Sequence, residues 1–441
     1  MTWNRRQVLG ATPGLAAMSG VARGAIAPTN VLILTVDALP AQVVGPHRRD
    51  PGGTWSAVMP RLGRLAKDGF VFRSARAVHP EPGPAAAAMW MGRPGSETGA
   101  MRTGQPASRE MPLLVDHIAD SGSADVFVVG GLGVPGRRPG PRVAELLSSH
   151  PVDNRAVATT TAAALSNQPP GRPWLGVVRL TGLSQLEATA GAWKALERSP
   201  DFGLPDRELP PAPDRAVPEA EPARIGVVDR PDRSKWDDAT WRHLLWSAAR
   251  TAGSVDRHIG DIIDVLDSTV HAAHTLVIVA AHCGHPLGRH GLDTTGTPYS
   301  HTLDVPLVMR AAGVAGGVDA LVSTIDLAPT VCDVLGVPQL PDARGYSVRP
   351  LLDRTAGTWR RSVVSESHID ARTIRTAEFA YTRYPDGGEL LFHTRNDPEE
   401  ARNLAIDTGY ASTVADHRAR LDDHATTLAP TPAAEAGWPS E

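Results

Sequence analysis

Cysteine is almost absent from this chain of 441 residues, which has only Cys283 and Cys332. Two cysteines cannot form the disulfide framework of a small secreted domain, so a large buried core must hold the fold. Positive charge is not in excess either, because 44 Lys and Arg stand against 48 Asp and Glu, a formal net charge of -4. This balance excludes the strongly basic surface typical of nucleic-acid binding. No apolar run approaches the ~20 residues of a membrane-spanning helix, so we predict no integral membrane segment.

A further absence falls in the segment Ala75–Gly95, which contains no Ser, Thr, Cys or Lys. The same segment has the pattern of a helix entry at an active site. Pro80 and Pro82 favour an extended approach, Pro84 suits the first helical position, and Gly92 ends the helix. A helix N-terminus attracts anions through its free N–H groups. We therefore expect this helix to lie at a ligand cleft, but without a nucleophilic side chain.

The first 27 residues have the layout of a twin-arginine export signal. Arg5 and Arg6 precede a mildly apolar run to Met18, and small residues end the segment at Ala27. We predict export to the periplasm, the cell surface or the medium. The alternative is a frayed N-terminus of a cytoplasmic protein.

Strand and helix patterns alternate over residues 28–352. Buried strands are predicted where β-branched residues and leucine dominate, at 29–36, 70–75, 124–130, 174–179 and 276–281, with strands or strand ends at 305–309 and 321–325. Helical spacing occurs at 59–67, 84–91, 156–165, 241–266 and 327–335. This alternation predicts an α/β fold with a mostly parallel central sheet sandwiched by helices.

Two other regions differ in composition from this pattern. Residues 199–235, rich in proline and acidic side chains, are expected to form a long polar excursion from the sheet. Residues 353–428 contain short alternating runs at 362–366, 379–383 and 389–393 and a charged helix at 412–426, which predicts a small C-terminal α+β subdomain. A flexible polar tail, 429–441, is expected to follow.

Taken in order, several segments resemble the sulfatase family of the alkaline-phosphatase-like superfamily, and within it the iduronate-2-sulfatase-like branch. The segments that carry the resemblance are Thr29–Pro40, Met59–Phe72, Ala87–Arg93 (AAMWMGR), Leu287–Leu292 (LGRHGL), Asp304–Arg310 (DVPLVMR), Ser323–Pro338, Gly345–Leu352 and Gly387–Ala405. The resemblance implies the sulfatase fold over nearly the whole chain after the export signal.

The resemblance also implies where the family's nucleophile should stand. Active members carry a C/S-x-P-x-R motif whose first residue is oxidised to formylglycine, and its hydrate attacks the sulfate ester. Aligned on Gly92-Arg93, the motif places Pro82 at the nucleophile, Pro84 at the proline and Ala86 at the arginine. Proline has no thiol or hydroxyl to oxidise, and alanine cannot stabilise a transferring sulfuryl group. No catalytic residue of the family type is therefore expected.

The family's calcium would be held by an Asp-Asp pair after the first strand and an Asp-His or Asp-Asn pair after the late strand. Here these pairs read Asp37-Ala38 and His282-Cys283. Calcium prefers six to eight oxygen ligands, so we expect its ligand set to be lost and no cofactor to be bound. Asp37 and His282 remain the candidate metal positions.

Two alternatives to these metal assignments stay open. A lone carboxylate at the end of a strand, such as Asp37, is as often a helix cap or an acceptor for loop N–H groups as it is a metal ligand. His282, Cys283, His285 and His290 are residue types that bind zinc, but adjacent residues of an extended segment point to opposite faces, which favours a structural role for them.

Three further family positions have lost their charge or proton carrier. A proline-histidine pair falls at Leu183-Ser184, a lysine at Thr295 and an arginine at Asp304. We therefore predict an exported pseudo-sulfatase that binds a small-molecule, sulfated or anionic ligand, or a partner. The alternative is a hydrolase of altered, metal-dependent chemistry that activates water at Asp37 and His282. A genuine sulfatase would require a different alignment of the nucleophile motif.

Overall fold

A computed structural model describes residues 28–44, 54–148, 153–186 and 236–428. The predicted export signal, the polar excursion over 199–235 and the tail 429–441 lie outside these residues. Within them, no helix is both long and apolar enough to cross a membrane.

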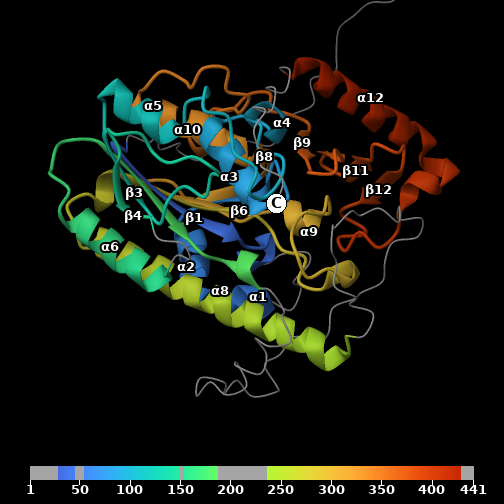
Figure 1. Ribbon diagram of the computed structural model, residues 1–441, viewed down its shortest axis with the longest axis horizontal. Helices are drawn as coiled ribbons and strands as arrows, with labels where there is room; N and C mark the ends of the chain where they lie inside the picture. The colour runs from blue at the N-terminus through green and yellow to red at the C-terminus, as the bar shows by residue number, and fades with distance from the viewer. Residues whose placement is uncertain (1–27, 45–53, 149–152, 187–235, 429–441) are drawn as a thin grey trace, which may run out of the picture.

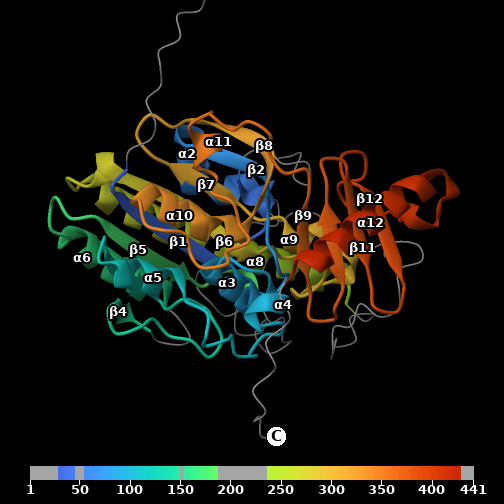
Figure 2. The ribbon, with the colours of Figure 1, turned by 90° about the horizontal axis from the view of Figure 1, so that it is seen from above.

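An eight-stranded sheet forms the centre of the molecule, with helices on both faces (Figures 1 and 2). Its strands, in spatial order, are β4 (Ala144–Leu147), β3 (Asp125–Val129), β5 (Trp174–Leu180), β1 (Asn30–Ala38), β6 (Thr275–Cys283), β7 (Leu307–Arg310), β2 (Phe70–Arg76) and β8 (Gly316–Ser323). Among the described strands of this sheet, only β7 runs antiparallel to its neighbours, which are β6 and β2. The prediction of a mostly parallel sheet between helices is therefore confirmed.

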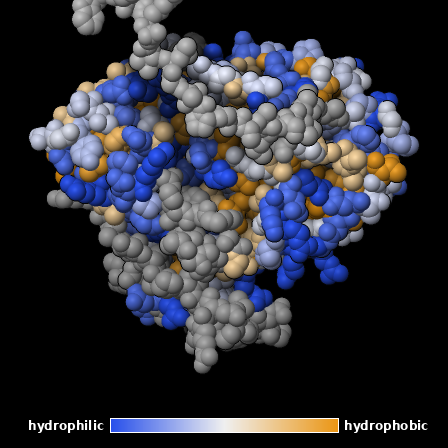
Figure 3. Space-filling model, turned by 180° about the vertical axis from the view of Figure 1, so that it is seen from behind, coloured by the Kyte–Doolittle hydropathy of each residue, from blue (hydrophilic) through white to orange (hydrophobic). Residues whose placement is uncertain are grey.

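Strands β1 and β6 are the centre of the core. Each has nine residues and all are buried, as expected of strands covered by helices on both faces. The strands pair in parallel, with Val31 opposite Leu276, while β5 pairs with the other edge of β1. On the molecular surface seen from behind the view of Figure 1, the coloured residues are mostly hydrophilic, with smaller hydrophobic groups between them (Figure 3).

The helices fall into two layers (Figures 1 and 2). One layer contains α3 (Pro82–Met91), α4 (Gly95–Thr98), α5 (Leu114–Ser121), α10 (Leu327–Leu335) and α11 (Arg349–Leu352), and the other α1 (Thr54–Val58), α2 (Pro60–Asp68), α6 (Asn154–Ser166) and α8 (Asp238–Asp267). Within the second layer, a side chain of α8 binds the start of α2. The Asp256 carboxylate on α8 accepts hydrogen bonds from the backbone N–H groups of Arg61 and Leu62, at 3.0 and 2.8 Å. It thus caps α2, whose own N-cap residue supplies no side-chain bond.

The C-terminal region forms a four-stranded antiparallel sheet with α12 (Ala411–Thr427) beside it. Its strands are, in spatial order, β12 (Glu389–His393), β11 (Phe379–Arg383), β10 (Arg372–Arg375) and β9 (Val363–Glu366). The expected α+β subdomain is present. Strand β10 was not predicted, because its sequence RTIR alternates charged and small polar residues with one apolar residue only.

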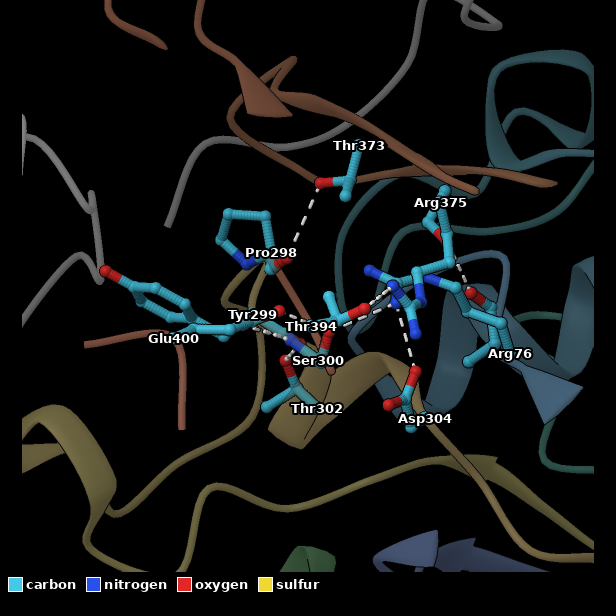
Figure 4. Close-up of polar contacts among 12 residues, drawn as sticks. Arg76, Pro298, Tyr299, Ser300, Thr302, Asp304, Thr373, Arg375, Thr394 and Glu400 are labelled. Carbon is cyan, nitrogen blue, oxygen red and sulfur yellow. Dashed lines mark hydrogen bonds and ion pairs between the residues drawn. The ribbon is translucent and has the colours of Figure 1, made fainter. Parts of the chain in front are cut away.

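A buried polar cluster connects the two sheets through α9 (Ser300–Leu303) (Figure 4). Arg76 at the end of β2 donates from Nη1 to the Ser300 hydroxyl, at 3.2 Å, and to Oδ1 of Asp304, at 3.0 Å. Glu400, which is 1% exposed, accepts the Ser300 backbone N–H at 2.8 Å and also the Ser300 hydroxyl. Asp304, at the position of a family arginine, therefore serves here as the partner of a buried arginine.

Candidate functional site

A cavity of about 720 Å³ opens where β1, β3, β5 and β6 end. It lies at the carboxyl ends of parallel strands, where open α/β sheets bind ligands. Seven of the positions singled out from the sequence line it, namely Asp37, Pro82, Leu183, Ser184, His282, His285 and Thr295. By contrast, Ala38, Pro84, Ala86 and Cys283 are buried and do not line it.

Helix α3 points its N-terminus at this cavity, but it begins at Pro82 with Glu81 as N-cap. The expectation that Pro84 is the first helical residue is thus wrong, because proline is tolerated throughout the first turn, where its missing N–H has no partner in the helix. Of the first three helical residues only Gly83 carries an N–H group, and the N–H of Ala85 is bonded to the Glu81 carbonyl at 3.0 Å. The helix start therefore offers an anion far less than a usual N-terminus does.

Asp37 is bound by an arginine that the sequence analysis did not single out. Arg179 on β5 donates from Nε to Oδ1 of Asp37, at 2.6 Å, and from Nη2 to Oδ2, at 3.0 Å. Its Nη1 donates to the Gly130 carbonyl at 3.1 Å. The two side chains are only 9% and 5% exposed, so this is a buried, bidentate ion pair. A single charged residue in the apolar run WLGVVRL was the signal that could have revealed it.

His282 lies beside this pair. Its Nδ1 is 3.7 Å from Oδ1 of Asp37, beyond hydrogen-bond distance, and neither ring nitrogen has a hydrogen-bond partner among the described residues. Burial lowers the pKa of His282, Asp37 opposes this shift and the Arg179 guanidinium adds to it, so that the resulting pKa is about 4. The imidazole is therefore neutral near pH 7.

The residues considered for zinc have separate partners. Cys283 donates from Sγ to the Asp37 carbonyl at 3.6 Å, and burial raises the pKa of its thiol. His285 accepts the Leu287 N–H on Nδ1, at 3.1 Å, and His290 stacks on Tyr299 with ring centroids 4.3 Å apart. Among the described residues, no group of three or more His, Cys, Asp and Glu is placed to hold a metal ion.

The same geometry tests the fit of calcium. Both carboxylate oxygens of Asp37 already bind a guanidinium, Ala38 supplies no ligand, and His282 supplies nitrogen rather than oxygen. Calcium needs several carboxylate or carbonyl oxygens around one point. The residues present do not fit the ion.

Glu81 holds the entrance of α3 in place, and its role was not foreseen. Its Oε2 accepts the backbone N–H of Thr103 at 2.7 Å and the Thr103 hydroxyl at 2.5 Å, and Nδ1 of His368 lies 2.6 Å from Oε1. Burial would raise the pKa of Glu81, but the bonds from His368 and Thr103 outweigh it and lower the pKa to about 2. The glutamate thus joins the loops at 103 and 368 to the start of the helix, next to the cavity.

The charged groups that line the cavity are balanced. Three are arginines and three are carboxylates: Arg137, Arg138, Arg179, Asp37, Glu145 and Asp293. Arg137 is half-buried and donates from Nη1 to the Ser108 and Met111 carbonyls, while Arg138 is exposed. The described lining has no net charge with which to hold a dianion.

Comparison with known proteins shows which proteins this chain resembles in sequence and in fold. Residues 288–427 match the family described as N-sulphoglucosamine sulphohydrolase, C-terminal. The chain is 26% identical over 449 aligned residues to a Delta 4,5-hexuronate-2-O-sulfatase of Bacteroides thetaiotaomicron, covering 93% of this chain and 91% of that protein. The chain belongs to the sulfatase family. Among solved structures, a putative sulfatase from the same organism superposes on this family member with a TM-score of 0.78 at 24% identity, covering 90% of this chain and 92% of the other. A 2-O GAG sulfatase superposes with a TM-score of 0.77 at 23% identity, covering 91% and 92%.

In this sulfatase-family chain the fold agrees with the resemblance seen in the sequence. The positions that the sequence resemblance assigns to the family chemistry hold other residues, and Arg179 binds the carboxylate of Asp37.

Proposed function

We propose that this protein is a sulfatase-family member that binds a saccharide ligand without hydrolysing sulfate esters. The observation that carries the proposal is the Asp37–Arg179 ion pair, because it uses the last metal-site carboxylate to neutralise a side chain of the protein. Pro82 at the nucleophile position supports the same conclusion, since it cannot become formylglycine. The protein still has a large cavity, and hydroxyl, imidazole and guanidinium groups are among those that line it. Such a cavity can bind a small molecule.

A second candidate is a sulfuric ester hydrolase, or another hydrolase, of altered metal-dependent chemistry. The name of the hexuronate-2-O-sulfatase relative favours it, since that protein aligns over nearly the whole chain. Such an enzyme would need a metal near His282, and elemental analysis of protein purified without chelator separates the two candidates. We expect well under one zinc per chain; zinc near one per chain that disappears in His282→Ala would favour the hydrolase.

The test of inactivity is sulfate release from aryl sulfates and from sulfated saccharides, after co-expression with a formylglycine-generating enzyme. We expect none from the natural protein. Pro82→Cys should be inactive too, because Ala38, Ala86, Ser184 and Thr295 would still lack the metal ligands and the cations that stabilise the transferring group. Turnover by the natural protein above the level of a sample without protein contradicts the proposal.

We also propose that residues 1–27 export the protein. Replacing Arg5 and Arg6 by lysine should retain it in the cytoplasm, as cell fractionation would show; unchanged distribution would refute twin-arginine export.

A further inference from the structure

We infer that the cavity receives a hexuronate whose hydroxyl groups are free, and that it discriminates against the sulfated form. This rests on the proposed function and adds to it the chemical class of the ligand. It reverses the preference that the name of the 2-O-sulfatase relative implies for that protein.

The first argument is the charge at the base of the cavity. Each nitrogen of the Arg179 guanidinium already donates to a protein oxygen, two to Asp37 and one to Gly130. A sulfate placed there would meet a cation that is neutralised by a carboxylate and would face that carboxylate at short range. Removing a sulfate from water without a free cation costs more than its hydrogen bonds return.

The second argument is the helix start. A sulfate bound at a helix N-terminus needs several N–H groups aimed at it. Pro82 and Pro84 have none, so α3 contributes the N–H of Gly83 alone in its first turn. The base of the cavity and the start of α3 therefore offer a sulfate neither a cation free of a carboxylate partner nor several backbone donors.

The third argument concerns the groups that are present. His282 lines the cavity, is fully buried, and has two ring nitrogens without a hydrogen-bond partner among the described residues. A neutral imidazole has one donor and one acceptor nitrogen, and a sugar hydroxyl can satisfy either because it both donates and accepts. The hydroxyls of Ser184 and Thr295 line the same cavity, and Ser184 lies 3.4 Å from Oδ2 of Asp37. These groups suit hydroxyls rather than a sulfate.

Arg138 lines the cavity, is exposed, and can meet one carboxylate. A hexuronate offers that combination, with a single carboxylate beside several hydroxyls. We therefore place the uronate carboxylate toward Arg138 and the hydroxyls toward His282.

The experiment uses the natural full chain and two matched probes, a Δ4,5-hexuronate disaccharide with and without a 2-O-sulfate. Calorimetric titration measures binding, and ion chromatography of the same samples measures released sulfate. We expect the free-hydroxyl disaccharide to bind at least about tenfold more tightly than its sulfated twin, with no sulfate released. Arg138→Ala should weaken binding of the free form, whereas Arg172→Ala, at an exposed ion pair with Asp125, should not.

The outcomes separate the two claims. Equal or tighter binding of the sulfated disaccharide without release of sulfate overturns this inference and leaves the inactive-protein proposal standing. Binding of neither probe also overturns the inference. Release of sulfate refutes the proposed function itself. If Arg138→Ala is misfolded by its melting curve, the preference of the natural chain between the two probes still decides.

Discussion

Removing the Arg179 side chain should destabilise the protein strongly, because it would leave Asp37 buried and unpaired. Both side chains of the pair are less than a tenth exposed. Breaking a buried ion pair by deleting one partner costs about 3–5 kcal/mol. The entropy of unfolding is about 2.1 cal/mol/K per residue, or on the order of 0.9 kcal/mol/K for this chain, so Arg179→Ala should lower Tm by about 3–5 °C.

Calorimetry of four proteins tests this reasoning: the natural chain, Arg179→Gln, Asp37→Asn and the double variant. The double variant should be less destabilised than the sum of the two single variants by at least about 1.5 kcal/mol, because it leaves no unpaired charge. Arg172→Ala is the matched control, since its ion pair with Asp125 is about half exposed and should contribute less than ~1 kcal/mol to stability. Additive effects of the two single changes, or a loss from Arg179→Gln no larger than that of the control, would refute a stabilising pair at the former metal site.

Three other results are expected. Millimolar calcium or chelator should leave Tm unchanged within about a degree, whereas an ion at a hundredfold excess over Kd would add about 2.7 kcal/mol of stability; a calcium-dependent shift of several degrees would restore the metal site. Glu81→Gln should destabilise the protein at pH 6 and much less at pH 3, because a carboxyl with its pKa lowered to about 2 stabilises the fold above its unfolded value of 4.5 and loses that effect as pH falls through the folded value; an equal loss at both pH values in urea titrations would contradict this. Trp90→Phe should cost about 1 kcal/mol by removing the bond from Nε1 to the Leu132 carbonyl, and Trp90→Ala about 3–5 kcal/mol by leaving a cavity, so similar denaturation midpoints for the two would be unexpected.

The central sheet could be predicted from the sequence because its strands are buried on both faces. Such strands are continuous apolar runs, and the ends of the runs at 29–36 and 276–281 fall within two residues of the ends of β1 and β6. The short edge strand β4 was not predicted, because Ala144–Leu147 alternates exposed and half-buried residues and has no such run. The spatial order of the strands, with β1 between β5 and β6, came only from the structure.

The candidate site was predictable where a residue sits at the end of a strand or the start of a helix. Asp37, Pro82 and His282 line one cavity for that reason. Arg179 was missed because the charged residue in the run WLGVVRL does not indicate its partner, Asp37, which lies on a neighbouring strand 142 residues away in the sequence. Glu81 was missed because its partners, Thr103 and His368, are distant in sequence and are brought to it by loops.

The order of the strands also sets when the protein can fold during synthesis. Strand β1 is among the first segments made, yet it pairs with β5 on one edge and with β6 on the other, and Val31 lies opposite Leu276. Until the ribosome has passed residue 283, the run TNVLILTV has an unpaired edge and an uncovered apolar surface. Segments of this kind form intermolecular β-structure readily. The nascent chain is therefore expected to depend on a holding chaperone for most of its translation, and to aggregate if synthesis stops before β6 is complete.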